Sequence, residues 1–388
     1  MRTVLGCAAM VGDPLRKTFA QPPVGLRRTI PALTGIRGVA ALLVVLFHLP
    51  LATLYSLPGE VPVIRNGTYG VEMFFILSGF ILLHVHSGDF ERPTFPALRQ
   101  FALTRFFRIY PLHVGVLLCI VVFVFMAPGY VAWFRTIPTF EDTFSPAGFF
   151  QTLTLTNRIG LPSLGDWNPP SWSLSSEVVG YATFPVLAHL ATKVRSLSLC
   201  FLSAIGLLTV YCVVRMAFSY EGSVIRMALC FSAGVALARA YHLRPVVRFS
   251  SSLAATCGLL SVTALAFDKT AAFSVFGFAG LIYALALGGG TLERFLASAP
   301  VMFLGTISFS LYLVHFILQT ALLWAFWGGD GYTEYPTLSL LILLGLNLGV
   351  ATLFYYLIER PSHQFGRRVA KRHAYPPASW APKLPSGN

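Results

Sequence analysis

Charged residues are scarce in this 388-residue chain, where Asp, Glu, Lys and Arg together make up 11%, against about 25% in an average soluble domain. Hydrophobic residues make up 55%, and the mean hydropathy is +0.70. So little charge excludes an ordinary water-soluble enzyme, and so apolar a composition excludes a disordered chain, a coiled coil or a collagen-like fibre. The composition therefore predicts a polytopic integral membrane protein.

Closely spaced cysteines are also lacking. The six cysteines are scattered, mostly within apolar runs, and no CxxC pair occurs. Because zinc sites and disulfide frameworks use recognisable cysteine spacings, we expect no disulfide framework and no cysteine-bound metal. No other metal site and no permanently bound cofactor are expected either. Acidic residues are fewer than basic ones, 15 against 28, for a net charge of +13. In a membrane chain such an excess encodes orientation, so we expect no nucleic-acid partner.

Long apolar runs are abundant. A helix needs about 20 apolar residues to cross the hydrocarbon core, and an all-α bundle of about ten transmembrane helices satisfies its backbone hydrogen bonds internally. The ten candidate ranges are about 38–57, 70–86, 110–127, 172–191, 197–219, 223–240, 250–267, 270–288, 301–326 and 337–358.

The basic residues predict the orientation. Most of them fall on one side of the membrane if the chain starts in the cytosol, and the positive-inside rule then places both termini there. We expect a cytosolic N-terminal tail (1–30), a transmembrane domain (31–361) with an outer loop at about 128–171, and a basic cytosolic C-terminal tail (362–388). The expected location is the inner or plasma membrane.

Ionisable side chains within spans are costly and are candidates for function. Arg37 and His48 are 11 positions apart, which places them on one helix face about 16 Å from each other. Arg37 would lie at the cytosolic mouth and His48 near mid-membrane. A membrane histidine can also serve only as an interhelical hydrogen-bond partner, and this alternative stays open for His48.

Three other spans carry polar or ionisable residues. The second contains Glu72, the fourth contains Ser173, Glu177 and Tyr181, and the ninth contains Ser308, Tyr312 and His315. Residues three or four positions apart share a helix face. If these groups face the interior of one bundle, they indicate a cavity whose side chains can bind and release protons. A proton-coupled transporter or flippase would have the same kind of cavity.

Arg105 and Arg108 lie three residues apart where the third span begins. Each guanidinium offers a planar fork of donors that matches a phosphate group. The same pair would serve equally as an anchor on lipid headgroups. Together with Arg37, the pair favours a phosphate-bearing donor that enters from the cytosol.

Six short motifs occur in order along the chain. They are Arg37 with His48, Phe74–Phe80 (FFILSGF), Arg105–Pro111 (RFFRIYP), Trp172–Glu177 (WSLSSE), Gly305–His315 (GTISFSLYLVH) and Tyr356–Pro361 (YLIERP). Together they resemble membrane-bound acyltransferase family 3, of the O-acetyltransferase type. The resemblance implies a ten-helix unit that takes an acyl group, usually acetyl from cytosolic acetyl-CoA, and places it on a hydroxyl of a glycan, lipid or secondary metabolite.

The resemblance also implies roles for particular residues. His48 matches the essential histidine, and we expect it to act as the general base, since its unperturbed pKa of about 6.5 suits this task. The family's donor-handling arginines correspond to Arg37, Arg105 and Arg108. A direct transfer and an acyl-histidine intermediate both remain open.

Further motif positions have less defined roles. Glu177, Trp172, Tyr312 and His315 match recurrent family positions, and Glu177 or Glu72 is expected to orient a histidine or the acceptor. The sequence departs from the family in having Glu72 where Asp is common. It also ends shortly after the last motif, whereas some relatives carry a fused extracytoplasmic SGNH-type esterase domain, so we expect the membrane unit to act alone.

The acceptor is expected to bind on the outer side. Trp167 and Asp166 of the outer loop, with Trp172 and Ser173, would stack against and hydrogen-bond a glycan, although the loop could equally just cap the bundle. A lipid or polyketide-type acceptor is the alternative. A transporter typically shows an internal repeat, and none is visible here. The expected partners are acyl-CoA, a glycan or lipid-linked acceptor and membrane lipids; the oligomeric state stays open.

Overall fold

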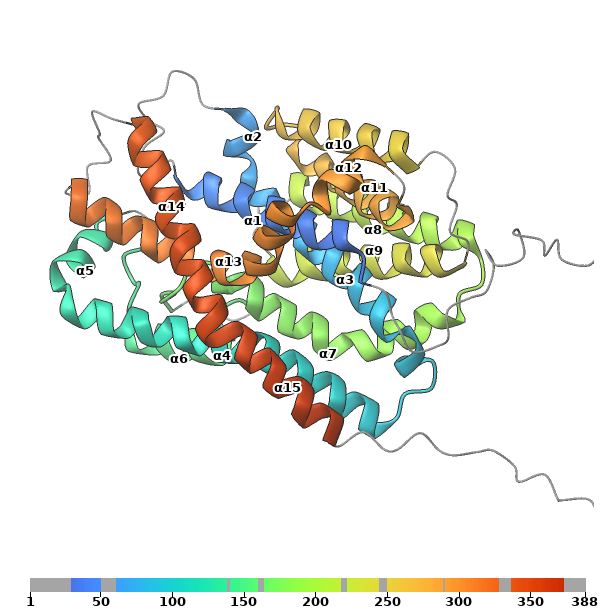
Figure 1. The fold of residues 1–388 in the computed structure, drawn as a ribbon, viewed down its shortest axis with the longest axis horizontal. Helices are drawn as coiled ribbons and strands as arrows, with labels where there is room; N and C mark the ends of the chain where they lie inside the picture. Colours follow the sequence, from blue (N-terminus) through green and yellow to red (C-terminus); the bar gives the residue numbers. More distant parts are fainter. Residues whose placement is uncertain are drawn as a thin grey trace, which may run out of the picture. The chain divides into compact units, whose positions relative to one another are not determined.

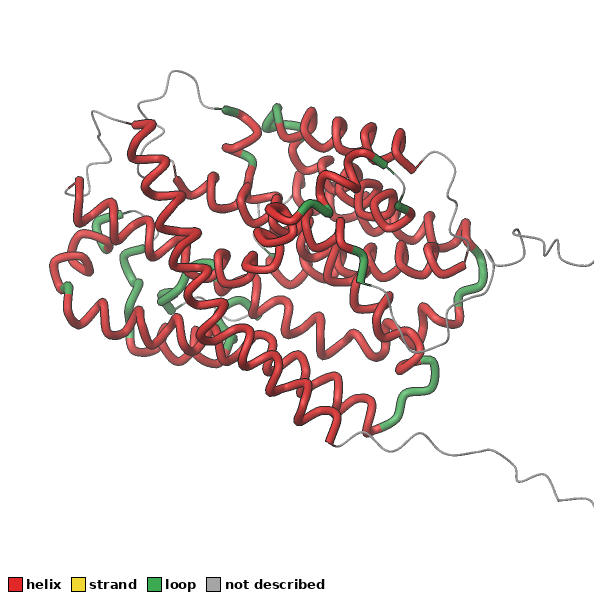
Figure 2. Tube along the Cα trace, viewed as in Figure 1, coloured by secondary structure: helices red, strands yellow, loops and turns green. Residues whose placement is uncertain are grey.

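The computed structural model describes residues 29–49, 61–137, 140–159, 164–217, 222–243, 250–288, 290–327 and 336–372. Within them the chain is helical, with short connections and no strand (Figure 1; Figure 2). The helices are α1 (Pro31–His48), α2 (Pro62–Arg65), α3 (Gly70–Phe90), α4 (Phe95–Met126), α5 (Pro128–Phe134), α6 (Pro146–Thr154), α7 (Ser171–Lys193), α8 (Leu197–Ala217), α9 (Ser223–Leu243), α10 (Ser250–Leu265), α11 (Ser274–Leu287), α12 (Thr291–Leu296), α13 (Ala299–Trp327), α14 (Pro336–Phe354) and α15 (Arg360–Arg372).

Each of the ten predicted ranges overlaps a helix, although part of the first range, 50–57, lies outside the described residues. Seven helical stretches of the described chain are long and apolar enough to cross a membrane: Pro31–His48, Gly67–Phe90, Phe95–Met126, Leu197–Ala217, Ser223–Leu243, Ala299–Phe326 and Leu338–Ala370. Helices α10 and α11 are apolar but shorter. Helix α7 is long but carries four serines, Glu177 and Lys193. The protein is therefore an all-helical, multi-pass membrane protein.

Proline and threonine fix the start of α4 well before the predicted residue 110. The Thr94 hydroxyl accepts a hydrogen bond from the Ala97 N–H at 3.3 Å, and a proline occupies the first turn, where its missing N–H costs nothing. Arg105 and Arg108 therefore lie well inside a helix of 32 residues. Hydropathy therefore indicated the apolar part of α4, whereas the capping residues determine where the helix begins.

Helices α1 and α13 pack through glycine. A Cβ on Gly38 would stand 2.6 Å from the backbone nitrogen of Gly305, and a Cβ on Gly305 would clash with the Thr34 carbonyl oxygen. The two backbones therefore touch, as small residues allow between membrane helices. His48 and His315, each ten residues beyond its glycine, are also in contact. Helices α1 and α13 consequently run parallel.

Helices α3 and α9 also pack through glycines, and the contacts of Glu72 with Arg226 and of His84 with His242 show that the two helices run parallel. A Cβ on Gly79 would strike the Phe231 carbonyl oxygen, and a Cβ on Gly234 would strike that of Ile76. Close backbone approach holds α9 against α3, and α7 packs on both helices. These contacts place the polar face of α7 in the interior of the bundle.

Helices α14 and α15 are joined by a π-helical turn, η6 (Tyr355–Glu359), and appear in Figure 1 as one red rod. Helix α15 packs on α4, where the Phe365 ring lies 5.2 Å from that of Phe107 and Gly366 faces the same phenylalanine. Residues 362–372 of the predicted tail are thus helical and held against α4.

Candidate active site

Two cavities lie within the bundle and share a wall. The arginine cavity, of about 130 Å³, is lined by α1, α3, α4, α7 and α13, and includes Arg37, Arg105 and Arg108. The histidine cavity, of about 450 Å³, includes His48 and is closed on one side by residues from 140–170. Tyr312 and Val71 line both cavities. They therefore separate the predicted donor groups from the predicted base.

His48, at the end of α1, forms a hydrogen-bonded pair with His315 of α13. Nδ1 of His48 lies 2.9 Å from the Val44 carbonyl oxygen, and Nδ1 of His315 lies 2.7 Å from that of Tyr312. A carbonyl oxygen only accepts, so in the neutral rings both Nδ1 atoms carry the proton. Nε2 of His315 then accepts from Nδ1 of His48, 3.1 Å away.

This assignment of tautomers, made from the hydrogen-bond network, leaves one lone pair available. Nε2 of His48 makes no hydrogen bond with any other described residue, and the side chain lines the larger cavity. The predicted base thus has its basic nitrogen free, with His315 supporting the opposite nitrogen. The sequence placed His315 at a motif position, and the structure brings it to His48.

Tyr312 is fixed at the wall by two hydrogen bonds from α13 to the start of α7. Its hydroxyl donates to the Pro170 carbonyl oxygen at 3.1 Å and lies 2.7 Å from the Ser173 hydroxyl. Ser173 is buried and lines the arginine cavity. Ser173 and Tyr312, predicted on separate helices, therefore meet where the two cavities meet.

Two of the three predicted donor arginines, Arg37 and Arg105, form no ion pair within the described residues. Within the described chain, Arg37 makes no hydrogen bond or ion pair. The Arg105 guanidinium lies 5.7 Å from the Phe101 ring and 5.9 Å from the Tyr181 ring, and its Nε is buried without a hydrogen-bond partner. Both arginines line the same cavity, as a phosphate-binding role requires.

Arg108 is engaged differently from the prediction. Its Nη1 lies 2.6 Å from Oε1 of Glu359, which is fully buried at the end of the π-helical turn. The other oxygen of Glu359 accepts from the Ser310 hydroxyl at 2.6 Å. A buried carboxylate needs such compensation, so the first role of Arg108 is to hold Glu359 and thereby fix α14 and α15 to α4 and α13.

Neither predicted carboxylate contacts a histidine. Oε1 of Glu177 accepts from Ser78 at 2.9 Å and from Tyr181 at 2.6 Å. Glu177 lines the arginine cavity together with Ser173 and Tyr181. The predicted four-residue stripe of α7 is thus confirmed. Its glutamate lies among the arginines, however, because α7 presents that stripe to α3 and α4.

Glu72 forms a buried ion pair with Arg226 of α9, which sequence reasoning missed. Oε1 of Glu72 accepts from Nε and Nη2 of Arg226 at 2.8 and 2.5 Å and from the Tyr211 hydroxyl at 3.0 Å. The Arg226 guanidinium stacks 4.9 Å from the Trp172 ring, and Trp172 lines the histidine cavity. Glu72 therefore acts through Arg226 on a cavity wall.

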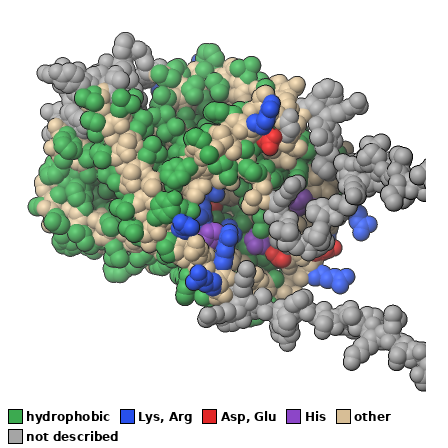
Figure 3. Space-filling view, viewed as in Figure 1, with side chains coloured by type: hydrophobic (Ala, Val, Ile, Leu, Met, Phe, Trp, Pro, Cys, Tyr) green, Lys and Arg blue, Asp and Glu red, His purple; other side chains and the backbone are tan. Residues whose placement is uncertain are grey.

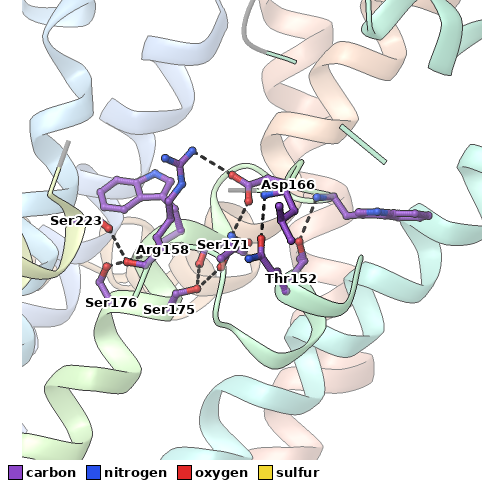
Figure 4. A network of polar contacts seen from close by, with 12 residues as sticks. Thr152, Arg158, Asp166, Ser171, Ser175, Ser176 and Ser223 are labelled. Atoms are coloured by element: carbon purple, nitrogen blue, oxygen red, sulfur yellow. Dashed lines mark hydrogen bonds and ion pairs between the residues drawn. The ribbon is translucent and has the colours of Figure 1, made fainter. Parts of the chain in front are cut away.

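A polar network ties the segment before α7 to that helix (Figure 4). Its centre is Asn157, whose amide nitrogen donates to Asp166 at 2.9 Å and to Ser171 at 3.1 Å, and whose oxygen accepts from Ser175. Arg158 also contacts Asp166, at 3.4 Å. Both donors of the buried Asn157 amide are used and its oxygen accepts one hydrogen bond, so the network fixes the rim of the histidine cavity.

The predicted acceptor residues divide into two groups. Asp166 and Trp172 line the histidine cavity. Trp167 does not: its indole N–H donates to the Ser145 carbonyl oxygen at 2.7 Å, and its ring packs against Phe144 and Phe149. We therefore withdraw Trp167 as a stacking platform, because its ring fills the core of the segment.

The family model described as acyltransferase domain, that of acyltransferase family 3, matches residues 30–356. The chain belongs to this family. It is accordingly an acyltransferase, and membership favours acyl transfer over the transporter alternative. No solved structure matches the chain.

Curated relatives agree with this membership of acyltransferase family 3. The chain is 29% identical over 405 residues to the acyltransferase MdmB of Streptomyces mycarofaciens, covering 94% of this chain and 99% of the relative. It is 26% identical over 328 residues to the peptidoglycan O-acetyltransferase OatA of Listeria monocytogenes, covering 76% of this chain but 50% of the relative. It is also 32% identical over 192 residues to protein 2 in the picA locus of Rhizobium radiobacter, covering 45% of this chain and 91% of that protein.

Some of the site residues that sequence reasoning missed could have been detected from the sequence. Arg226 is an ionisable group within an apolar stretch, the criterion that selected Glu72. Glu359 lies inside the motif Tyr356–Pro361, for which no role was predicted. Asn157 gave no signal, because buried amides in irregular segments have no sequence pattern.

Proposed function

We propose that this acyltransferase moves an acyl group, acetyl in the first instance, from cytosolic acyl-CoA to a hydroxyl of a glycan, with His48 as the base. The observation that carries the proposal is the free Nε2 of His48 at a cavity of about 450 Å³. Arginines line a second cavity across Tyr312. A volume of this size is within the range of about 300–1,000 Å³ that holds small ligands.

The proposed step balances with the groups present. Nε2 of His48 takes the proton of the acceptor hydroxyl as the oxygen attacks the thioester carbonyl carbon. The new ester C–O bond forms, the C–S bond breaks, and the departing thiolate receives the proton from His48. The hydrogen bond from His48 Nδ1 to His315 supports the positive charge that the ring carries between these two transfers.

Arg37 and Arg105 are proposed to receive the phosphates of the donor. Their open guanidinium groups supply forked donors in a partly buried site, where charge-assisted hydrogen bonds are strongest. The narrow arginine cavity of about 130 Å³ admits a slender chain. A thioester arm would extend through it to the Tyr312 wall, where the hydroxyl groups of Tyr312 and Ser173 are hydrogen-bonded to each other and to the Pro170 carbonyl oxygen.

We propose ten spans with both termini in the cytosol. Helices α1 and α13 are the first and ninth of the ten, and α3 and α9 are the second and sixth. In an alternating topology each pair must run parallel, in line with the contacts of His48 with His315 and of Glu72 and His84 with Arg226 and His242. The tail (1–30), the transmembrane domain (31–361) and the basic tail (362–388) follow from this topology, with the enzyme in the inner or plasma membrane.

A glycan is the proposed acceptor because the rim of the histidine cavity is polar. Asp142, Asp166 and Arg158 line it together with Trp172. Carboxylates accept from sugar hydroxyls, and an indole offers an apolar face. The name of one relative, a peptidoglycan O-acetyltransferase, is in line with this choice. A lipid or polyketide-type acceptor would need the apolar part of the same cavity, lined by Phe140 and Phe316.

Purified protein in vesicles, given labelled acetyl-CoA and native envelope glycans, tests the proposal. The wild type should transfer label, and the variant His48→Gln should lose about 10²–10⁴-fold in rate while acetyl-CoA still raises its melting temperature. Activity retained in His48→Gln would overturn the base assignment. Failure of the wild type with acetyl-CoA on every acceptor class would overturn the donor.

A further inference from the structure

Ionisable residues of the turn η6 and of helix α15 form a stripe near the arginines of the arginine cavity. Glu359, His363 and Arg367 follow at four-residue spacing, so they lie one turn apart on one face. The first of them pairs with Arg108 of α4, which turns the stripe toward the cavity. On this side of the molecule, blue and purple side chains gather around a hollow (Figure 3).

The imidazole of His363 lies within electrostatic reach of Arg37, Arg105, Arg108 and Arg367. Arg37 in turn interacts with the carboxylates of Glu177 and Glu359. Four guanidinium groups thus face two carboxylates, leaving an excess of positive charge in a partly buried region. Clefts lined by one sign of charge attract ligands of the opposite sign, so the surplus here favours a multivalent anion.

The outermost of these cations has no ion-pair partner. Arg367 is exposed, and within the described residues it makes no hydrogen bond or ion pair. By contrast, Arg108 is bound to Glu359, and Arg105 is stacked on aromatic rings. Arg367 and His363 are therefore the groups that a ligand meets first on its way to Arg37 and Arg105.

The volume of the arginine cavity determines which part of an acyl-CoA would lie near His363 and Arg367. The arginine cavity measures about 130 Å³, below the roughly 300 Å³ at which small-molecule pockets begin. It is too small for the nucleotide of an acyl-CoA, so only the acylated end of the pantetheine arm would enter it. The adenosine 3′,5′-diphosphate end would then remain outside the cavity, on the side where His363 lies near its arginines.

We propose that His363 and Arg367 of α15 form the outer part of the donor site and bind the 3′-phosphate of coenzyme A. This inference rests on the proposed use of acyl-CoA. The two side chains act as donors to the phosphate oxygens, and Glu359 positions them through its ion pair with Arg108. Helix α15 is then a wall of the donor site.

The test uses the full-length protein in vesicles of neutral lipid and compares acetyl-CoA with acetyl-dephospho-CoA, which lacks only the 3′-phosphate. In Arg367→Gln and His363→Asn the KM for acetyl-CoA should rise about 5-fold. The KM for acetyl-dephospho-CoA should stay at the wild-type value. Arg368→Gln is the matched control, because it removes the same charge from the next, exposed position, and it should leave both values unchanged.

Each outcome decides a different point. A wild type without acetyl-CoA activity would refute the proposed donor. An active wild type whose KM rises equally for both donors, or not at all, in Arg367→Gln would refute the 3′-phosphate site alone. Lipid headgroups are the other source of phosphate near a basic helix. If Arg367→Gln and Arg368→Gln both reduce the rise in melting temperature that anionic lipid gives the inserted protein, without changing either KM, α15 is a lipid anchor and the inference fails.

Discussion

Nε2 of His315 lies 3.1 Å from Nδ1 of His48, across the interface of two parallel helices. Together with the Val44 carbonyl oxygen, the contact is consistent with one tautomer of His48, whose other nitrogen makes no hydrogen bond with a described residue. The second histidine is thus a positioning residue for the first.

Two substitutions of His315 should distinguish the hydrogen bond that it makes with His48 from the space that its ring fills. His315→Leu removes one of the two acceptors of His48 Nδ1, leaving the Val44 carbonyl oxygen, and should lower kcat, by less than the roughly 10²–10⁴-fold expected from losing the base itself. His315→Gln restores an amide acceptor and should recover part of that loss, with KM for the donor unchanged in both variants. Equal kcat values for the two variants in steady-state transfer assays would contradict the positioning role.

The ion pair of Arg108 and Glu359 should matter more for stability than for donor affinity. Arg108→Gln leaves a buried carboxylate without its cation and should cost about 3–5 kcal/mol. The double variant Arg108→Gln/Glu359→Gln should be more stable than Arg108→Gln, since the uncompensated charge is gone. Arg37→Gln is the contrast: it should raise the KM for acetyl-CoA with little change in thermal unfolding in detergent. The opposite pattern would make Arg108 a donor residue, as the sequence first suggested.

Arg226 should control the acceptor side through Trp172. Arg226→Lys keeps a charge for Glu72 but loses both the planar stack 4.9 Å from the indole and the two-nitrogen contact with the carboxylate. We expect a higher KM for the acceptor and an unchanged KM for acetyl-CoA. Phe231→Leu, which changes the packing of the same helix without touching the ion pair, serves as the control for general loosening of α9.

Asn157 should hold the rim of the histidine cavity. Asn157→Asp places a carboxylate beside Asp166 and removes two donors, so the segment before α7 should open to protease cleavage and the acceptor KM should rise. Asn157→Ala loses the same bonds without the repulsion and should have a smaller effect, about 1–3 kcal/mol in stability. Limited proteolysis of the two variants in vesicles would show this order, and equal cleavage would contradict it.

Helix positions and shared faces were predictable because hydropathy and the period of 3.6 residues act locally. Ser173, Glu177 and Tyr181 lie on one cavity as expected. Partners on other helices were not predictable, because pairing depends on which helices pack. Glu177 or Glu72 was expected to orient a histidine or the acceptor, and Glu177 lies with Ser78 and Tyr181. Arg108 was expected to bind a donor, and its ionic partner is 251 positions further along the chain. Motif order alone does not contain that information.

Gly38 and Gly305 act on the reaction from a distance. Each histidine lies ten residues beyond its glycine, about 15 Å along the helix axis. A change in the angle between α1 and α13 at the glycines therefore moves the two imidazoles apart by a distance that grows with this separation. A hydrogen bond tolerates only a few tenths of an ångström of lengthening. The alignment of the two rings is therefore set by the absence of two methyl groups far from the chemistry, and a methyl added at either position would uncouple the imidazoles without altering a single reacting atom.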